Sequence, residues 1–410
     1  MDTRSDRFPL IDSLRAIAAL AVVGTHASFF AGAYGTGAAL GVYLARLEAG
    51  VTLFFLISGF LLYRPFVKAR LAGGAAPLTR AYAWRRFLRV GPAYWVALTV
   101  IALWLGLAGV FTADGIPTFY AFGQIYREAT IGGGLAQAWS LSLEVAFYAF
   151  LPLWALAMRR FIPVRDLRNG VRAEIWALVL VVVASFAFKV VLVADTLDSP
   201  TRFTPLLVSL PAYMDHFALG MLLAVLSVAT EKGLGAGSTL IAVIDRHPWI
   251  PWALALAALL VTGALLSAKE FFAGYSGGQV LIRHGLYGCV ALGLVLPAVF
   301  GSPNRGWVRR LLGWRPLLFL GLVSYGIFLW NLAGLQQLER WGYGDVTLTH
   351  PYVDWFVVGA AAAALLGTVS YYVVERPFLL LKRLVGQPAP GVTDGEALAE
   401  SAPATPVRAG

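Results

Sequence analysis

The sequence predicts an all-α membrane protein: a polytopic bundle of about ten transmembrane helices with both termini in the cytoplasm. Three observations predict this class. The 410-residue chain is 59% hydrophobic, and its mean hydropathy is +0.72. Charged residues make up 13% of the chain, about half of the roughly 25% typical of soluble domains. Apolar segments long enough to cross a bilayer recur along the whole chain.

Ten segments qualify as membrane spans by length and hydropathy. They cover residues 10–30, 50–66, 88–110, 138–158, 173–194, 205–228, 249–268, 279–300, 317–338 and 353–374. The N-terminus and every second loop carry 24 Lys and Arg residues, whereas the opposite loops carry 5. Because cytoplasmic loops are enriched in basic residues, this split places both termini in the cytoplasm.

Two stretches lie outside this pattern. Residues 116–137 contain only a short apolar run, which favours a re-entrant or interfacial segment on the outer side. Residues 386–410 are rich in Pro, Ala and Gly and predict a disordered cytoplasmic tail. Residues 1–385 are therefore expected to form one transmembrane domain.

Charge and cysteine content limit the partners that we expect. The net charge of +10 is explained by basic cytoplasmic loops on a membrane surface, so membrane lipids are expected partners and nucleic acid is not. The single cysteine, Cys289, excludes an intrachain disulfide and a multi-cysteine metal site. No metal is expected.

The first span carries an arginine and a histidine, Arg15 and His26. They are eleven residues apart, which places them only about 20° apart around a helix and roughly 16 Å apart along it. Ionisable groups within a membrane helix are costly unless they face a protein interior or a wet cavity. Both residues are therefore expected to face one functional path.

Glu144, in the fourth span, is the expected partner of His26. Counted from the outer end of its span, it lies at a depth comparable to that of His26. A carboxylate beside the imidazole would fix the ring tautomer and raise its basicity, which suits a general base acting on a hydroxyl. The alternative is a structural pair that joins two helices.

Arg86 and Arg89 lie where the chain enters the third span, on neighbouring faces of one helix start. Two arginines at this spacing favour bidentate binding of phosphates. The alternative is ordinary anchoring on anionic lipid at the cytoplasmic surface.

Other polar residues within spans are weaker candidates. Asp215 in the sixth span and Arg283 in the eighth, each followed by a histidine, are predicted to pair with each other or with residues lining the path. Lys189 is predicted to extend its ammonium to the outer interface. Ser58 and Gly59 predict close approach of a neighbouring helix.

Six segments, in order, resemble the acyltransferase 3 family of integral-membrane acyltransferases. They read LIDSLRAIAALAVVGTHA, FFLISGFLLYRPF, RRFLRVGP, WSLSLEVAFY, SYGIFLWN and SYYVVERPF, and the resemblance covers residues 8–383. It implies transfer of an acyl group, usually acetyl from a cytoplasmic coenzyme A thioester, to a hydroxyl of a sugar or other acceptor.

The resemblance also implies roles for individual residues. Arg15 and His26 match the first-helix pair, with His26 the expected catalytic residue, and Arg86 and Arg89 match the arginines expected to engage the acyl donor. Glu144 matches the acid of the Trp-Ser-Leu motif. The residues expected to line or support the substrate path are Asp12, Ser58, Trp139, Ser140, Asp215, Arg283, Tyr325, Asn331 and Glu375.

The chain departs from the family pattern in the ninth span. Phe328 and Asn331 stand where the family usually has Tyr and His, so this position cannot supply an imidazole.

The sequence therefore predicts a multi-pass O-acyltransferase of the bacterial cytoplasmic membrane. Its expected co-substrate is acyl-CoA, in particular acetyl-CoA, with no bound cofactor. The expected acceptor is a sugar, a cell-envelope glycan or a glycosylated metabolite. A separate periplasmic partner is expected if a second transfer step is needed. The alternative is a proton-coupled transporter of an acyl or sugar compound, with His26, Glu144 and Asp215 as its relay.

Overall fold

A computed structural model describes residues 8–32, 39–201, 204–235, 238–266, 274–345 and 350–384. Within these ranges the elements are helices and helical turns, and the β-structure is one isolated bridge between Pro200 and Ser276. Eight helices are long and apolar enough to cross a membrane, and counting each of two bent pairs as one span gives ten. The predicted all-α membrane bundle is confirmed. The side of the membrane on which the termini lie stays a prediction, and the predicted tail lies outside the described residues.

The described residues form the following helices, given in chain order. They are α1 (Pro9–Phe30), α2 (Ala39–Ala45), α3 (Ala49–Leu71), α4 (Thr79–Leu105), α5 (Gly115–Tyr120), α6 (Trp139–Phe161), α7 (Leu167–Leu192), α8 (Leu210–Glu231), α9 (Thr239–Arg246), α10 (Trp249–Leu265), α12 (Gly277–Val299), α13 (Trp307–Leu312), α14 (Arg315–Leu322), α15 (Ser324–Arg340), α16 (Pro351–Ser370) and α17 (Arg376–Leu380). A π-helical turn, Tyr371–Glu375, joins α16 to α17.

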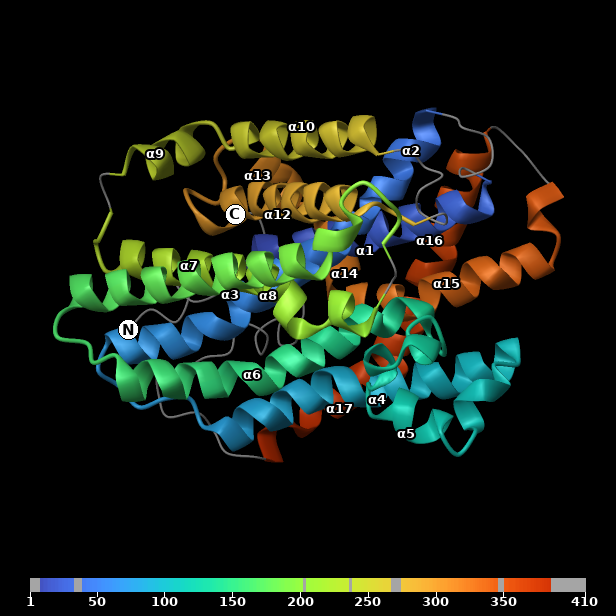
Figure 1. Cartoon of the computed structure of the whole chain (residues 1–410), viewed down its shortest axis with the longest axis horizontal. Coiled ribbons are helices and arrows are strands. Elements are labelled where there is room, and N and C mark those ends of the chain that lie inside the picture. The colour runs from blue at the N-terminus through green and yellow to red at the C-terminus, as the bar shows by residue number, and fades with distance from the viewer. Residues whose placement is uncertain are drawn as a thin grey trace, which may run out of the picture.

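Helix α1 lies at the centre of the bundle, packed against α3, α14, α15 and α16. Figure 1 shows most of the long helices running in roughly the same direction and α16 crossing them steeply, with α10 at one edge and α4 with α17 at the opposite edge. Glycines permit the closest packing. A Cβ atom at Gly59 of α3 or at Gly220 of α8 would overlap the main chain of the other helix, so the close approach predicted at Ser58 and Gly59 is confirmed.

The predicted continuous span at 317–338 is wrong in one respect, because α14 and α15 meet at an angle of 74°. The break falls at Val323, and the hydroxyl of Ser324 donates to the carbonyl oxygen of Gly321 at 2.8 Å, which satisfies an acceptor at the end of α14. A Cβ atom at Gly321 would overlap the main chain of Asp12, so α14 docks closely on α1. A second bend of 89° separates α9 from α10.

Residues 116–137 were predicted to form no full membrane span, and in the structure they form no long helix. They contain most of the short helix α5 and brief 3-10 turns. The segment packs on α4, where the hydroxyl of Tyr94 donates to the carbonyl oxygen of Phe119 at 2.9 Å and the indole of Trp95 donates to that of Tyr120 at 2.8 Å. These bonds satisfy main-chain groups in a segment without long helical structure.

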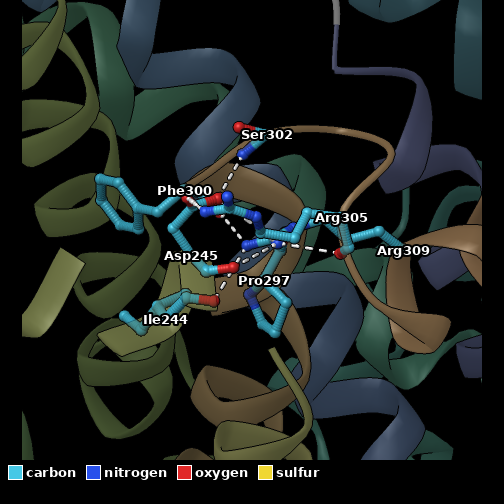
Figure 2. Close-up of polar contacts among 7 residues, drawn as sticks. All are labelled: Ile244, Asp245, Pro297, Phe300, Ser302, Arg305 and Arg309. Carbon is cyan, nitrogen blue, oxygen red and sulfur yellow. Dashed lines mark hydrogen bonds and ion pairs between the residues drawn. The ribbon is translucent and has the colours of Figure 1, made fainter. Parts of the chain in front are cut away.

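Arg309 connects α9, α12 and α13 at one end of the bundle through hydrogen bonds. Its side chain is 1% exposed, and its guanidinium lies among main-chain oxygens (Figure 2). The acceptors, at 2.7 to 3.2 Å, are the carbonyl oxygens of Ile244, Asp245, Pro297, Phe300 and Arg305. These bonds use all five N–H donors of the arginine, so the side chain ties three segments together.

Candidate active site

Two cavities among the described residues are lined by most of the predicted site residues, and we name each by the residues that distinguish it. The histidine cavity, of about 440 Å³, is lined by His26, His216 and His284 among other residues. The arginine pocket, of about 70 Å³, is lined by side chains that include Arg15, Arg86 and Arg89. Phe328 of α15 lines both, so the two cavities adjoin at this ring.

Arg15 and His26 both face cavities, as their shared helix face predicts. Arg15 lines the arginine pocket and His26 lines the histidine cavity. The first helix therefore connects the two cavities, with one ionisable group in the wall of each.

His26 is held by Asn331 of α15. The His26 Nδ1 atom lies 2.5 Å from the Asn331 Oδ1 atom. The Asn331 side-chain nitrogen donates to the carbonyl oxygen of Phe328 at 2.6 Å, which fixes the amide with its oxygen toward the ring. Because Oδ1 can only accept, Nδ1 carries the proton and the Nε2 atom of a neutral His26 keeps its lone pair. This tautomer is the one that a general base using Nε2 requires.

Glu144 does not pair with His26, so that prediction is wrong. Its Oε1 atom accepts hydrogen bonds from Ser58 at 2.6 Å and from Tyr148 at 2.7 Å. Glu144 lines the arginine pocket instead of the histidine cavity. A depth estimated along a span does not fix the direction in which a side chain points around the helix, and α6 directs Glu144 toward α3.

The arginine pocket brings together most of the residues predicted near the acyl donor. Arg15 lies 3.8 Å from the Asp12 carboxylate, and Arg89 lies 3.6 Å from the Glu375 carboxylate. Glu375 is 1% exposed and ends the π-helical turn. The other predicted residues that line this pocket are Ser58, Ser140, Glu144 and Tyr325.

Asp215 and Arg283 do not pair with each other; each pairs with a residue that borders the histidine cavity. Asp215 accepts a hydrogen bond from the His284 Nε2 atom at 2.7 Å. Arg283 donates to Glu48 at 2.9 Å, and the hydroxyl of Tyr287 donates to the same oxygen at 2.9 Å. Trp139 also lines this cavity.

Lys189 does not extend to the interface, so that prediction is wrong. The residue is 2% exposed, and its ammonium lies 2.8 Å from the His284 Nδ1 atom and 3.8 Å from the ring centre of Tyr213. The face of α7 that carries Lys189 packs toward α8 and α12, where polar partners are available, so the charge is satisfied inside the bundle.

Two charged residues of the histidine cavity were not predicted as site residues from the sequence. Glu48 lies in a turn just before α3, where an acid at the edge of an apolar segment carries no distinctive signal. Lys189 carried the signal of an intramembrane charge, which favours function over snorkelling.

Asp215, His216 and His284 form a cluster whose candidate ligand atoms lie within 4.8 Å of one another, close enough to hold a metal ion. Both ring nitrogens of His284 already have partners, Asp215 and Lys189. An ammonium beside the ring disfavours a second cation, so the donor set fits a hydrogen-bonded network better than a metal site. The absence of a bound metal stays a prediction.

Comparisons with known proteins match most of the chain. The model of the acyltransferase 3 family, described as an acyltransferase domain, matches residues 8–373. The chain is 22% identical over 396 residues to the peptidoglycan O-acetyltransferase OatA of Listeria monocytogenes, covering 90% of this chain and 55% of that protein. It is 25% identical over 391 residues to YrhL of Bacillus subtilis, covering 90% of this chain and 54% of that protein.

A shorter match adds a second kind of relative. The chain is 34% identical over 179 residues to the acyltransferase MdmB of Streptomyces mycarofaciens, covering 41% of this chain and 44% of that protein. The chain thus spans about half the length of the first two relatives. No solved structure matches it with significance.

Proposed function

This chain belongs to the acyltransferase 3 family, and on that premise we propose that it moves an acetyl group from acetyl-CoA to a hydroxyl of a sugar-bearing acceptor. It is a multi-pass membrane acyltransferase. We place it in the bacterial cytoplasmic membrane, with the donor entering from the cytoplasm. One observation carries the proposal: His26, held by Asn331, lines a cavity that adjoins a pocket lined by three arginines.

The arginine pocket supports binding of the acyl donor. Coenzyme A carries phosphates, which arginine binds through paired, charge-assisted hydrogen bonds. Arg86 and Arg89 lie on the first turns of α4, beside Arg15 of α1. A donor held there by its phosphates would direct its thioester toward Phe328 and the histidine cavity beyond it.

The histidine cavity supports binding of the acceptor and the proton transfer. The Nε2 atom of His26 takes the proton from the acceptor hydroxyl as its oxygen bonds to the thioester carbonyl carbon. The carbon–sulfur bond then breaks, and the coenzyme A thiolate receives the proton from His26. The products are an O-acetyl ester and free coenzyme A, and His26 returns to its neutral form with Nδ1 still donating to Asn331.

The names of the relatives support the choice of acceptor. A protein named as a peptidoglycan O-acetyltransferase matches over 90% of this chain, which favours a cell-envelope glycan. The shorter match to MdmB keeps a glycosylated metabolite as the second acceptor class. If the acetyl group must reach an acceptor away from the membrane, we propose that a separate periplasmic partner carries out that second transfer.

The test uses the purified full chain in lipid nanodiscs with labelled acetyl-CoA and cell-envelope glycan fragments. The wild-type protein should release coenzyme A and transfer label to an alkali-labile ester. His26→Ala should lower the transfer rate by about 10²- to 10⁴-fold, the range of general-base catalysis. His350→Ala, which removes an exposed histidine at the start of α16, is the matched control and should transfer at the wild-type rate.

Two outcomes would contradict the proposal. The first is normal transfer by His26→Ala. The second is uptake of the acceptor into vesicles with no thioester cleavage, which would favour the proton-coupled transporter.

A further inference from the structure

Lys189, His284 and Asp215 form a hydrogen-bonded chain from three helices, α7, α12 and α8. The Lys189 ammonium lies 2.8 Å from His284 Nδ1, and His284 Nε2 lies 2.7 Å from Asp215. All three residues are at least 95% buried. Lys189 and His284 line the histidine cavity that also contains His26. Lys189, His284 and Asp215 have no role in the acyl transfer proposed above.

The direction of each hydrogen bond follows from the chemistry of the partners. The Asp215 carboxylate accepts, so His284 Nε2 carries the proton and donates it. In a neutral ring, His284 Nδ1 then has a lone pair and accepts from Lys189. The ammonium has three N–H donors, of which one is used by His284, and the ring of Tyr213 lies 3.8 Å away. Lys189 therefore retains donor capacity beside the cavity.

His216 supplies the complementary group. Its Nε2 atom lies 3.2 Å from the carbonyl oxygen of His284, an acceptor, so Nε2 carries the proton and Nδ1 keeps a lone pair. Nδ1 is buried and has no hydrogen-bond partner among the described residues. The ring stacks on that of His284 with centroids 4.0 Å apart, and the residue lines the cavity. A buried acceptor without a partner is costly until a ligand or water satisfies it.

The charges of the cavity favour a neutral ligand. The charge of Lys189 is balanced by Asp215 through the His284 ring, and the charge of Arg283 is balanced by Glu48. An anion would also face the lone pair of His216 Nδ1. A hydroxyl suits both groups, since its oxygen can accept from Lys189 while its hydrogen is donated to His216.

We propose that Lys189 and His216 form a second hydroxyl-binding subsite in the histidine cavity, positioned by His284 and Asp215. The subsite binds a hydroxyl of the acceptor other than the one that is acylated, and it thereby turns a neutral polyol toward His26. This inference rests on the proposed function, because it takes the histidine cavity to be the acceptor site. It makes the acceptor a molecule with at least two hydroxyl groups.

The test measures sugar binding to the full chain in nanodiscs without any acyl donor. The probes are methyl N-acetyl-β-glucosaminide, methyl α-rhamnoside, chitobiose, the singly deoxygenated forms of each, and N-acetylglucosamine 1-phosphate as the anionic comparison. Lys189→Met and His216→Phe should each weaken binding of a neutral sugar about tenfold, the effect of one lost hydrogen bond in a buried site. Because both groups bind one hydroxyl, the double variant should bind no more than about threefold more weakly than either single variant.

One of the deoxygenated sugars should lack the hydroxyl that this subsite binds. It should bind the wild-type protein about as weakly as the parent sugar binds the variants, and Lys189→Met should not weaken its binding further. Val191→Ala, which shortens an exposed side chain of the helix that carries Lys189, is the matched control and should alter the Kd by less than about twofold. His216→Gln, which restores an acceptor oxygen, should recover part of the affinity.

The inference is overturned if no neutral sugar of the panel binds, if the variants bind all sugars as the wild type does, or if the phosphate binds more tightly than its neutral parent. Loss of sugar binding on chelation, restored by Zn²⁺, would also overturn it and assign a metal to Asp215, His216 and His284. Thermal unfolding of each variant separates lost binding from lost folding. Release of coenzyme A, measured separately, reports whether the proposed acyl transfer itself fails.

Discussion

Arg309 and the arginines of the arginine pocket differ in the groups that surround their guanidinium N–H donors. Arg309 is 1% exposed, and its five N–H donors all meet main-chain carbonyl oxygens. Arg15 and Arg89 keep 17% and 15% of their side chains exposed, lie 3.8 and 3.6 Å from the carboxylates of Asp12 and Glu375, and line a pocket. An arginine whose donors are all used by the main chain has nothing left for a ligand. Arginines that border a cavity retain the geometry to bind one.

The largest expected effect tests the ligand-binding half of this comparison. Arg86→Ala combined with Arg89→Ala should lower kcat/KM for acetyl-CoA by about 10²- to 10⁴-fold, since each charge-assisted hydrogen bond contributes about 1.5–3 kcal/mol. Because Arg89→Ala also removes the charge beside the buried Glu375 carboxylate, the unfolding temperature should fall as well, and kcat/KM is therefore measured on the folded fraction. Arg80→Ala, which removes an exposed arginine of the same helix, is the matched control. Unchanged kcat/KM in the double variant would assign these arginines to lipid anchoring.

The second-largest expected effect tests the structural role of Arg309. Arg309→Met leaves several buried carbonyl oxygens without donors and should lower the free energy of unfolding by about 3–5 kcal/mol. Arg309→Lys keeps the charge but offers only three donors, so the loss should be smaller. The measurement is thermal unfolding in detergent, with the KM for acetyl-CoA of the folded fraction as the second readout. A raised KM at unchanged stability would show that Arg309 acts on the donor.

The sequence predicted the features that depend on composition and on position along a helix. Apolar length predicted the helices, and the spacing of Arg15 and His26 predicted that both face inward. Features that depend on how helices rotate against one another were not predicted. Glu144 was placed at the depth of His26, yet it points to Ser58 and Tyr148.

Asn331 shows a second kind of limit. The sequence predicts that Asn331 lines or supports the substrate path and that it cannot supply an imidazole, but it does not predict a contact with His26. The structure shows that its amide holds the ring of His26, from a residue 305 positions away in the chain. The bend between α14 and α15 has the same origin, because the docking of Gly321 on Asp12 is a tertiary contact that hydropathy does not record.

The smallest effect concerns Asp245, which lies beside Arg309 and ahead of the membrane-spanning helix α10. The main-chain N–H of Ser302 donates to its carboxylate and, together with Arg305, holds the pKa of Asp245 below its usual range. A pKa that is lower in the folded state stabilises the fold above the unfolded pKa of about 3.9, and this contribution is lost as the pH falls through the folded pKa. The contribution should be about 1 kcal/mol or less, because Arg305 is largely exposed and solvent screens the pair.

Asp245→Asn should therefore lower the unfolding temperature at pH 6 and lower it by less at pH 3, because protonation of the unfolded carboxylate has by then reduced the contribution of the wild-type residue. Asp114→Asn, at a helix start whose side chain makes no capping bond, should match the wild type at both values. A deficit for Asp245→Asn that is as large at pH 3 as at pH 6 would mean that the residue acts through packing. In that case Arg309 would be held by its carbonyl oxygens alone, and the charge beside it would contribute nothing to the junction of α9, α12 and α13.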